Sequence, residues 1–499
     1  MVTKKKSSLI YFLKIILSEW TKYGEIGALK NTSSWTNILL KFVFIFIFLT
    51  SATYCVSSVW TSLNKYKEFN TVTSLKMIYE SPTPFPVISF CSLKRLNKTS
   101  AKSFLESILY DNNNKNSLVM DISEYDNDAL FDYYYDIFDF IMLNLAKINT
   151  SEDFRKNVGF TIDNMLLSCK FNLFSCSKND FKYFFHTQYG NCYSFNTENE
   201  VKQSIFPGSS YGLSMELFLG DPNLHSEFEM DDGIIIVVHN QSDLPFLNSD
   251  RVFVATGTET DIKINRNFIF KLGPPYSECI HNNQFLKSEF YDYIVNELHI
   301  RYTQQHCYSL CLQKFVIKNC GCSSNWLLNF KNLPYCNHTK IGCISENVKS
   351  GLSGKIPNNC EEKCPMECEV SEYKVTTSRI SYPSPYLKKM LIKNNLVKES
   401  GISVEEIDKT VLKFNIYYES LAYRVIAEKE SITAQIFFSN LGGTLGLCLG
   451  LSILSLVKVV GFLVSILIAL KDRNCEINKS LNLEKETISI SSRLVVKKN

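Results

Sequence analysis

Residues 439–452 read Ser-Asn-Leu-Gly-Gly-Thr-Leu-Gly-Leu-Cys-Leu-Gly-Leu-Ser, within an apolar segment that has no charged residue from Ser431 to Val457. Lys458 interrupts this segment, and Val459–Leu470 is again uncharged. One bilayer crossing needs about 20 apolar residues, and this segment is roughly twice that length. Part of it must therefore stand outside the lipid or be broken, and the glycines indicate where.

Small residues gather on one side of this segment. At about 100° per residue, four of them fall on one narrow face of a continuous helix: Ser439, Gly446, Gly450 and Gly461. One interpretation is close helix packing, since small side chains let backbones approach each other. The other is a pore, because unwound backbone at membrane depth is tolerated where it lines water, and bare carbonyls there can replace an ion's hydration shell.

The string from Ser439 to Ser452 resembles the pore helix of the degenerin/epithelial sodium channel family. In that family a Gly-x-Ser tripeptide is the narrow ion filter, which the resemblance assigns to Gly450, Leu451 and Ser452. The resemblance also assigns Ser439 to the degenerin gating position, where bulky side chains hold the pore open. Gly446 then stands at the amiloride-contact position.

Two positions below this string depart from the family pattern. Lys458 stands where the family usually has Glu, and Gly461 stands where another acid is common. An acid would attract cations into the inner pore, whereas Lys458 would repel them, and an ionisable group inside a membrane span is functional by default. The alternative is a lysine that snorkels to the inner interface.

A first membrane span is expected near the N-terminus. The 42–64 stretch has no charged residue and is bounded by Lys41 and Lys65. It begins too late and is too long for a cleaved signal peptide, and its length disfavours a buried core helix. Residues 1–41 carry a net charge of +5 and residues 471–499 carry +3, which leaves −5 for the middle. The positive-inside rule then puts both termini in the cytosol.

These observations predict a multi-pass protein of the plasma membrane with five regions. They are a cytosolic segment (1–41), a first transmembrane helix (42–64), an extracellular disulfide-rich domain (65–430), a pre-pore segment with the second transmembrane helix and the filter (431–470), and a cytosolic tail (471–499). Four Asn-x-Ser/Thr glycosylation motifs fall in the extracellular region, at Asn97, Asn149, Asn240 and Asn337.

The cysteine count agrees with this topology. Of 17 cysteines, Cys55 and Cys448 lie in the expected spans and Cys475 lies in the cytosolic tail. The other 14 form an even set in an oxidising compartment. Their Cys-x-Cys and Cys-x₃-Cys spacings can also ligate zinc, but the extracellular location argues against a metal site.

The cysteine spacings resemble the thumb domain of the same family, and this resemblance implies a disulfide pairing that spacing alone does not give. The implied pairs are Cys91–Cys192, Cys169–Cys176, Cys279–Cys368, Cys307–Cys364, Cys311–Cys360, Cys320–Cys343 and Cys322–Cys336.

Three further stretches bear on the resemblance to this family. The 83–91 run, with Pro84 and Pro86 before apolar residues, resembles the first extracellular strand. The 413–420 run alternates like a last strand that leads into the pore helix. Tyr23 and Gly24 stand where the family has a His-Gly pair that helps gating; the glycine is kept and the histidine is not, and an ordinary turn glycine is the alternative.

The predicted fold class is an α+β membrane protein with two transmembrane helices and a large disulfide-rich extracellular domain, formed by a β-sheet palm with a helical thumb and finger. The resemblance implies a pore-forming subunit of a homo- or heterotrimeric, amiloride-sensitive sodium channel. An extracellular stimulus would gate it, with a peptide or other ligand favoured over protons or force. The alternative is a non-conducting two-pass surface receptor or a regulatory subunit that needs heteromeric partners.

The remaining expectations concern chemistry and partners. The sequence contains no nucleophile–base grouping, phosphate loop or paired carboxylates, so no enzyme, cofactor or metal is expected. Expected partners are sodium ions, related subunits, membrane lipid and an extracellular peptide, and nucleic acid is not among them.

Overall fold

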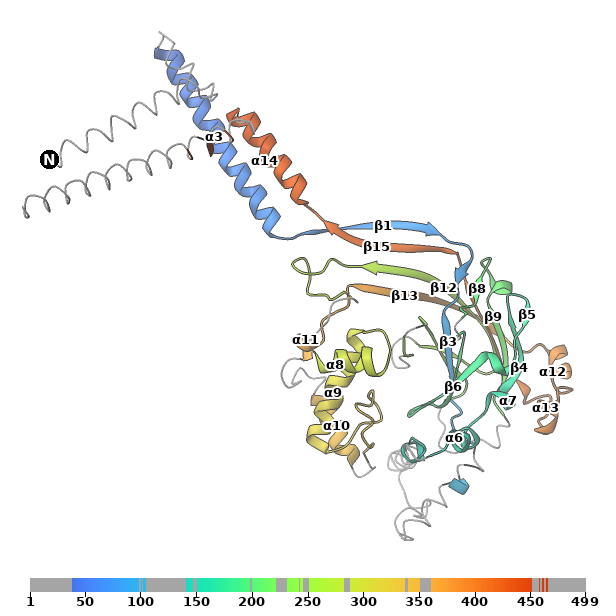
Figure 1. Ribbon diagram of the computed structural model, residues 1–499. Helices are drawn as coiled ribbons and strands as arrows, with labels where there is room; N and C mark the ends of the chain where they lie inside the picture. Colours follow the sequence, from blue (N-terminus) through green and yellow to red (C-terminus); the bar gives the residue numbers. More distant parts are fainter. Residues whose placement is uncertain are drawn as a thin grey trace, which may run out of the picture. The chain divides into compact units, whose positions relative to one another are not determined.

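The computed structural model describes residues 38–97, 100, 102–104, 141–146, 150–197, 200–220, 231–241, 243–245, 251–281, 288–336, 340–350, 360–450, 457, 460, 461 and 464. The chain divides into two compact units. The first unit combines Met1–Val72 with Glu430–Asn499, and the second is Thr73–Lys429. Within the described residues, the first unit is helical and the second holds the β-sheets (Figure 1).

Among its described residues, the first unit has the helices α3 (Ile38–Lys67) and α14 (Ala434–Leu449), which come from opposite ends of the sequence. In the described part of the chain, Ile45–Lys67 of α3 is the one stretch long and apolar enough to cross a membrane. Large apolar side chains of α3, including Phe42 and Phe46, are exposed. Such a surface needs lipid or a protein partner around it.

In sequence order, the first and last strands of the larger sheet of the second unit are directly connected to α3 and α14. Its strands are β1 (Thr71–Tyr79), β4 (Leu166–Phe171), β5 (Phe174–Ser175), β9 (Leu213–Phe218), β12 (Thr258–Phe270), β13 (Glu369–Ser381), β14 (Val411–Tyr418) and β15 (Ala422–Glu430). Among the described residues the order is β1-β15-β12-β14-β9-β4-β5, with β13 paired to β12 outside this path. The long strand β12 pairs in parallel with β14 along its first half and with β15 along its second.

A smaller antiparallel sheet lies against the larger one. Its order is β11-β10-β3-β7-β6, and a separate short ladder joins β2 to β8. The bounds are β2 (Thr83–Pro84), β3 (Val87–Ser92), β6 (Phe181–His186), β7 (Gly190–Phe195), β8 (Gln203–Ser204), β10 (Ile234–His239) and β11 (Arg251–Val254).

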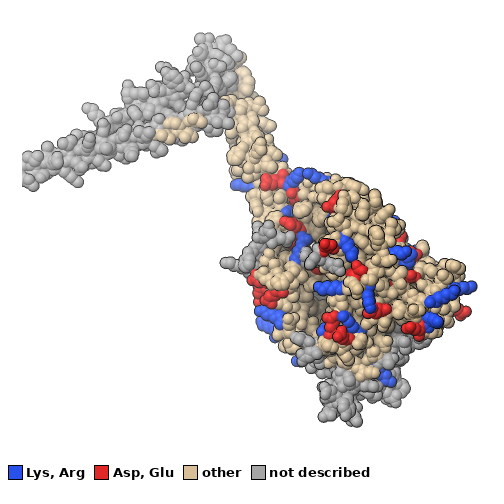
Figure 2. All heavy atoms as spheres, turned by 45° about the vertical axis from the view of Figure 1, so that its right-hand side comes forward, with Lys and Arg blue, Asp and Glu red and all other residues tan. Residues whose placement is uncertain are grey.

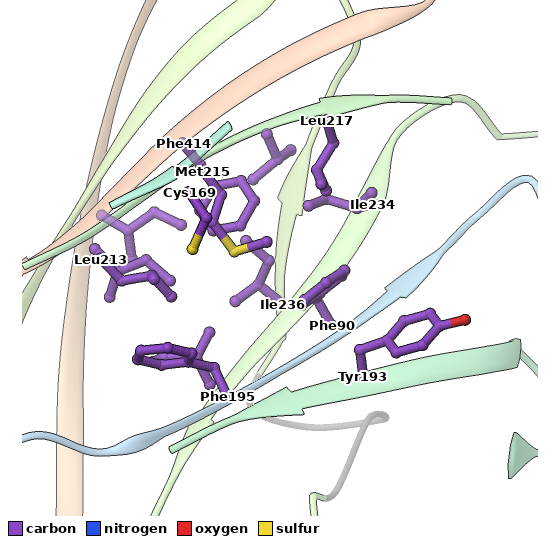
Figure 3. Packing of buried hydrophobic residues seen from close by; sticks show 14 of the residues in the cluster. Phe90, Cys169, Tyr193, Phe195, Leu213, Met215, Leu217, Ile234, Ile236 and Phe414 are labelled. Carbon is purple, nitrogen blue, oxygen red and sulfur yellow. The ribbon is translucent and has the colours of Figure 1, made fainter. Parts of the chain in front are cut away.

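Buried side chains of the two sheets form the main core (Figure 3). Phe90 of β3 and Phe195 of β7 are fully buried on the side of the smaller sheet, and Met215 of β9 and Phe414 of β14 are fully buried on the other side. The rings of Phe90 and Phe414 lie 6.4 Å apart between centroids. Burial of this much apolar surface is the dominant stabilising contribution to the fold of the unit.

Helices of different lengths lie beside the sheets (Figure 1). They are α6 (Glu152–Val158), α7 (Ile162–Met165), α8 (Glu289–Asp292), the π-helix η5 (Tyr293–Glu297), α9 (Gln304–Cys320), α10 (Ile341–Ser350), α11 (Cys360–Lys363), α12 (Pro385–Leu391) and α13 (Asn395–Glu399), with 3₁₀ turns η2 (Lys178–Asp180), η3 (Ser209–Tyr211) and η8 (Ile407–Lys409). α8, η5 and α9 enclose a second cluster of buried aromatic residues, which includes Phe290 and Tyr293.

The strand expectations were met at one end of the chain and were wrong at the other. The 83–91 run forms β2 and the fully buried strand β3, as predicted. The 413–420 run falls on β14, which is not the last strand: β15 follows it and leads to α14. β14 lies between β12 and β9 and is buried on nearly every residue, so it is an interior strand rather than a half-exposed one.

Charged side chains mark a difference between the two units. Figure 2 shows Lys, Arg, Asp and Glu interspersed over the visible face of the second unit, whereas the described surface of α3 and α14 is almost free of charge. The second unit is therefore suited to water and the helices are not.

Candidate functional site

Helix α14 contains the first part of the 439–452 string, and local sequence determines where the helix begins. Thr433 is the N-cap: its backbone is extended, and its side-chain oxygen accepts a hydrogen bond from the Ile436 backbone N–H at 3.2 Å. This bond satisfies one of the free donors of the first turn. No acidic residue lies in that turn. The helix thus starts at Ala434, five residues before Ser439.

The same helix ends at the first residue of the expected filter. Gly450 is the C-cap, with φ 65° and ψ 23°, and its N–H donates to the Gly446 carbonyl at 3.0 Å. This left-handed conformation costs a residue with a Cβ roughly 1–2 kcal/mol, and glycine adopts it freely. A helix break at Gly450 therefore follows directly from the residue that occupies the position.

The break changes one expectation. A continuous helix placed Gly461 on the same face as Ser439, but helical geometry does not carry through Gly450. Gly461 has helical backbone and is exposed, as are Val457, Val460 and Val464. Its angular position relative to Ser439 is therefore not set by a single helix.

Contacts with α3 divide α14 into two faces. Phe437 is 8% exposed and stacks on Tyr66 of α3, with ring centroids 4.6 Å apart. Eleven residues later on α14, the carbonyl of Cys448 accepts a hydrogen bond from Ser51 Oγ at 2.8 Å. At about 100° per residue, Phe437 and Cys448 lie within about 20° of each other around the helix. This is the face of α14 that packs on α3.

The small residues lie on the opposite face. Ser439 and Gly446 are about 180–200° around the helix from Phe437. Ser439 is exposed and Gly446 is half-buried. An added Cβ at Gly442, Gly443 or Gly450 would meet no other described atom within 4 Å. The face predicted to line a pore therefore points away from α3 and is open to another chain or to water.

Several predicted site residues lie outside the described residues. These are Tyr23, Gly24, Leu451, Ser452, Lys458, Asn149 and Asn337. Cys475 also lies outside them. The filter is thus described at Gly450 alone, and the second membrane crossing stays a prediction.

Two predicted glycosylation sites are described, and both are half-buried: Asn97 and Asn240. Asn240 donates both hydrogens of its Nδ2 atom, to Asp243 Oδ2 at 2.8 Å and to Ser371 Oγ at 2.7 Å. A glycan on that nitrogen would leave one hydrogen, so the two bonds could not both persist.

Seven disulfides brace the described part of the second unit, and they are the seven pairs that the resemblance implies: Cys91–Cys192, Cys169–Cys176, Cys279–Cys368, Cys307–Cys364, Cys311–Cys360, Cys320–Cys343 and Cys322–Cys336. Cys91 and Cys192 are direct partners in the β3–β7 ladder. Two bridges fasten α9 to the segment that contains α11. These cysteines are consumed in bridges and are not zinc ligands.

A cavity of about 500 Å³ opens beside the β4–β5 hairpin of the second unit. Its walls are mostly apolar, and its lining includes Phe174, Phe206 and Tyr211. Asp180 and Lys202 form an ion pair at 3.1 Å in the same lining. Pockets with apolar walls and a few polar groups are typical of ligand sites.

Comparison with known proteins identifies the family to which the sequence is similar. The sequence profile of the amiloride-sensitive sodium channel family matches residues 25–462. The epithelial sodium channel subunit alpha of Homo sapiens is 28% identical over 313 residues, which cover 62% of this chain and 46% of that protein. The gamma subunit of Bos taurus is 27% identical over 317 residues, covering 62% and 47%. The chain thus spans about half the length of the curated relatives it matches.

Similarity to a solved structure is weaker. A cryo-EM structure of a proton-activated chloride channel covers 86% of this chain and 98% of its own, with 7% sequence identity and a TM-score of 0.32. At that score the likeness supports no conclusion about fold or function. The interpretation of α14 therefore rests on the family match and on the geometry of the helix itself.

Proposed function

Because this chain belongs to the amiloride-sensitive sodium channel family, we propose that it is a pore-forming subunit of a sodium-selective channel in the plasma membrane. The observation that carries the proposal is the geometry of α14: its small-residue face points away from α3, and the helix breaks at Gly450. A helix with this geometry can approach copies of itself closely and present backbone to an ion.

The end of α14 supplies the chemistry that a cation needs. The last carbonyls of a helix have no intrahelical donor, and the C-terminal end of a helix carries a partial negative charge. Gly450 places this end of α14 at the first residue of the proposed filter, Gly450–Leu451–Ser452. Carbonyl oxygens gathered there from several subunits would replace the hydration shell of a sodium ion.

One copy of α14 cannot enclose a path, so we propose a closed ring of subunits. Most homo-oligomers have closed point-group symmetry, and head-to-tail contacts between subunits give a ring when the rotation closes. The family resemblance favours three subunits, as a homotrimer or with related chains. Ser439 and Gly446 would face the axis, and the apolar surface of α3 would face lipid. The second crossing would follow Gly450 and return the chain to the cytosol, so that both termini are cytoplasmic.

We propose that an extracellular ligand opens the channel, with a peptide favoured. Two features of the second unit support this. The disulfides make a braced body that can transmit a local change, and β1 and β15 are neighbours in the sheet and continue directly into α3 and α14. The cavity lined by Phe174, Phe206 and Tyr211 offers an apolar place for a side chain of such a ligand.

A second candidate is a regulatory subunit that conducts poorly without partners. The observation that favours it is Lys458, a positive charge in the apolar segment below the filter. The two functions differ in one experiment. Cells that express this chain alone, with surface delivery checked by biotinylation, are tested with candidate peptides and with amiloride. Amiloride-blocked sodium current supports the homomeric channel, and current that appears only after co-expression of a related subunit supports the regulatory role.

A further inference from the structure

Three cysteines lie outside the seven bridges, and the structure brings two of them together. Cys55 lies on α3 and is 2% exposed, and Cys448 lies on α14 and is half-buried. Their thiol groups lie close enough to interact with each other. Both residues belong to the first unit, so the contact is internal to one compact body.

A neighbouring bond fixes the two helices at this level. Ser51 precedes Cys55 by one helical turn and lies on the same face of α3. Its hydroxyl donates to the Cys448 backbone carbonyl at 2.8 Å. Cys448 is therefore held against α3 through its backbone carbonyl. The placement of the thiol pair does not depend on one flexible side chain.

A second contact confirms the register. Tyr66 follows Cys55 by eleven residues and Phe437 precedes Cys448 by eleven, and these two rings stack at 4.6 Å. At 1.5 Å per residue, the two contacts are about 16 Å apart along each antiparallel helix. Because the spacing matches on both helices, the helices stay in contact over this length.

We propose that Cys55 and Cys448 are a redox-sensitive thiol pair, which a peroxide converts into a disulfide between α3 and α14 of the same subunit. One thiolate attacks hydrogen peroxide and becomes a sulfenic acid, with hydroxide as the leaving group, which takes up the thiol proton and leaves as water. The second thiol then attacks that sulfur, forms the S–S bond and releases a second water. Two sulfur atoms are oxidised by two electrons in total, and the peroxide oxygen atoms are reduced. A dithiol reductant reverses the step.

The bond would tether the end of α14 two residues before the break at Gly450. It would hold the face that packs on α3 and leave the small-residue face free. The consequence for current rests on the proposed function: a tethered α14 can no longer shift against α3, so stimulus-evoked current falls on oxidation and returns with dithiothreitol.

The chemical test does not require current. Washed membranes that contain the full chain are treated with hydrogen peroxide, free thiols are blocked with N-ethylmaleimide, and the protein is digested without reductant. Mass spectrometry is expected to find the peptide that contains Cys55 joined to the peptide that contains Cys448, two hydrogens lighter than the separate pair and absent after dithiothreitol. Recovery of both cysteines as maleimide adducts after oxidation would overturn the proposal.

Variants separate this pair from other cross-links. Cys475→Ser is the matched control, because it removes the third unbridged cysteine and should leave the joined peptide unchanged. Cys55→Ser and Cys448→Ser should each abolish it, and Cys55→Ala gives a second variant if the serine variant folds poorly. Cys55 joined to Cys55, or Cys448 to Cys448, would show contact between subunits and contradict the assignment. Current recorded from wild type and Cys448→Ser in parallel tests the gating consequence alone, so failure of the channel function would leave the mass result standing.

Discussion

Tyr66, near the end of α3, stacks on Phe437 in the first turn of α14, with ring planes 19° apart. Beside this pair, the Ser431 backbone N–H donates to the Asn70 carbonyl at 2.9 Å, so the chain that leaves α3 is also bonded to the chain that enters α14. The two helices are thus joined where they meet strands β1 and β15.

Ser439→Phe is expected to give current without a stimulus. Ser439 is exposed on the face of α14 away from α3, where subunits would approach each other in the closed pore. Overpacking of a close contact costs about 1–3 kcal/mol, which corresponds to a rise of about 5- to 160-fold in the open-to-closed ratio. Whole-cell recording measures it, with Ser439→Ala as the small control. An unaltered closed state in a variant that reaches the surface would contradict the assignment.

Gly446→Trp is expected to weaken amiloride block by about tenfold or more, a loss of about 1.4 kcal/mol of binding free energy. Gly446 is on the same face as Ser439, four residues before the break, and the absence of a side chain leaves room for a flat cation in the outer pore. Its carbonyl still accepts the Gly450 N–H in the variant, so the helix end is kept. The inhibition curve is compared with that of Leu447→Trp, which is 90% exposed and one position off this face. Equal block in the two variants would place Gly446 away from the blocker.

Lys458→Glu is expected to raise unitary conductance of the homomer or to create it. Three lysines near a cation path repel sodium, and three carboxylates attract it, most strongly at low ionic strength, where screening is least. Lys471→Glu, near the cytosolic end, is the matched charge control. The same conductance for wild type and Lys458→Glu in dilute salt would mean that Lys458 snorkels to the interface and does not face the pore.

His186 predicts a pH dependence of stability in the second unit. Burial, with a smaller effect of the nearby Arg95 charge, lowers the pKa of His186 to about 4. Its Nδ1 atom accepts the Gln188 N–H at 3.2 Å, which requires the neutral ring. An unfolded histidine has a pKa of about 6.5, so the unfolded chain binds more protons between pH 6.5 and 4, and stability falls as the pH falls through this window.

The expected loss from His186 is about 2 kcal/mol between pH 7 and pH 5. Thermal unfolding of the full chain in detergent measures it, in wild type and in His186→Gln, which cannot be protonated. His299→Asn is the control, because His299 is exposed and asparagine tolerates its positive φ of 55°. A pH dependence that is the same in His186→Gln and wild type would contradict the role of this histidine.

Some parts of the structure could be predicted from the amino-acid sequence, and others could not. An interruption of the apolar segment could be predicted, because the segment is too long for one crossing, but its position at Gly450 rather than at another glycine could not. The disulfide pairs could be predicted from family resemblance and not from spacing, since many pairings fit the same intervals. The alternation in residues 413–420 predicted a last strand leading into the pore helix, but β15 follows β14. Asn415 of β14 is buried and donates hydrogen bonds to Glu259 and Asp261.

The contact between α3 and α14 was beyond sequence reasoning. Phe437 and Phe438 are neighbours of the same residue type, and only the fold makes one 8% and the other 68% exposed. A helix that is apolar on every side gives no hydrophobic period from which to choose a packed face. Ser51 and Cys55 could be placed on one face of α3, but no rule indicated that Cys448 would lie against them. The small-residue face of α14 could still be predicted from the sequence, because it is recognised by the size of its residues and not by their polarity.

The most direct test of the central claim is the reversal potential of the current carried by Ser439→Phe, because this variant needs no knowledge of the stimulus. External sodium is replaced by potassium and then by a large organic cation in cells whose surface expression has been measured. We expect an amiloride-blocked current whose reversal potential moves to more negative values when external sodium is removed. A variant that is present at the surface and carries no current, or whose reversal potential is indifferent to sodium, would contradict it.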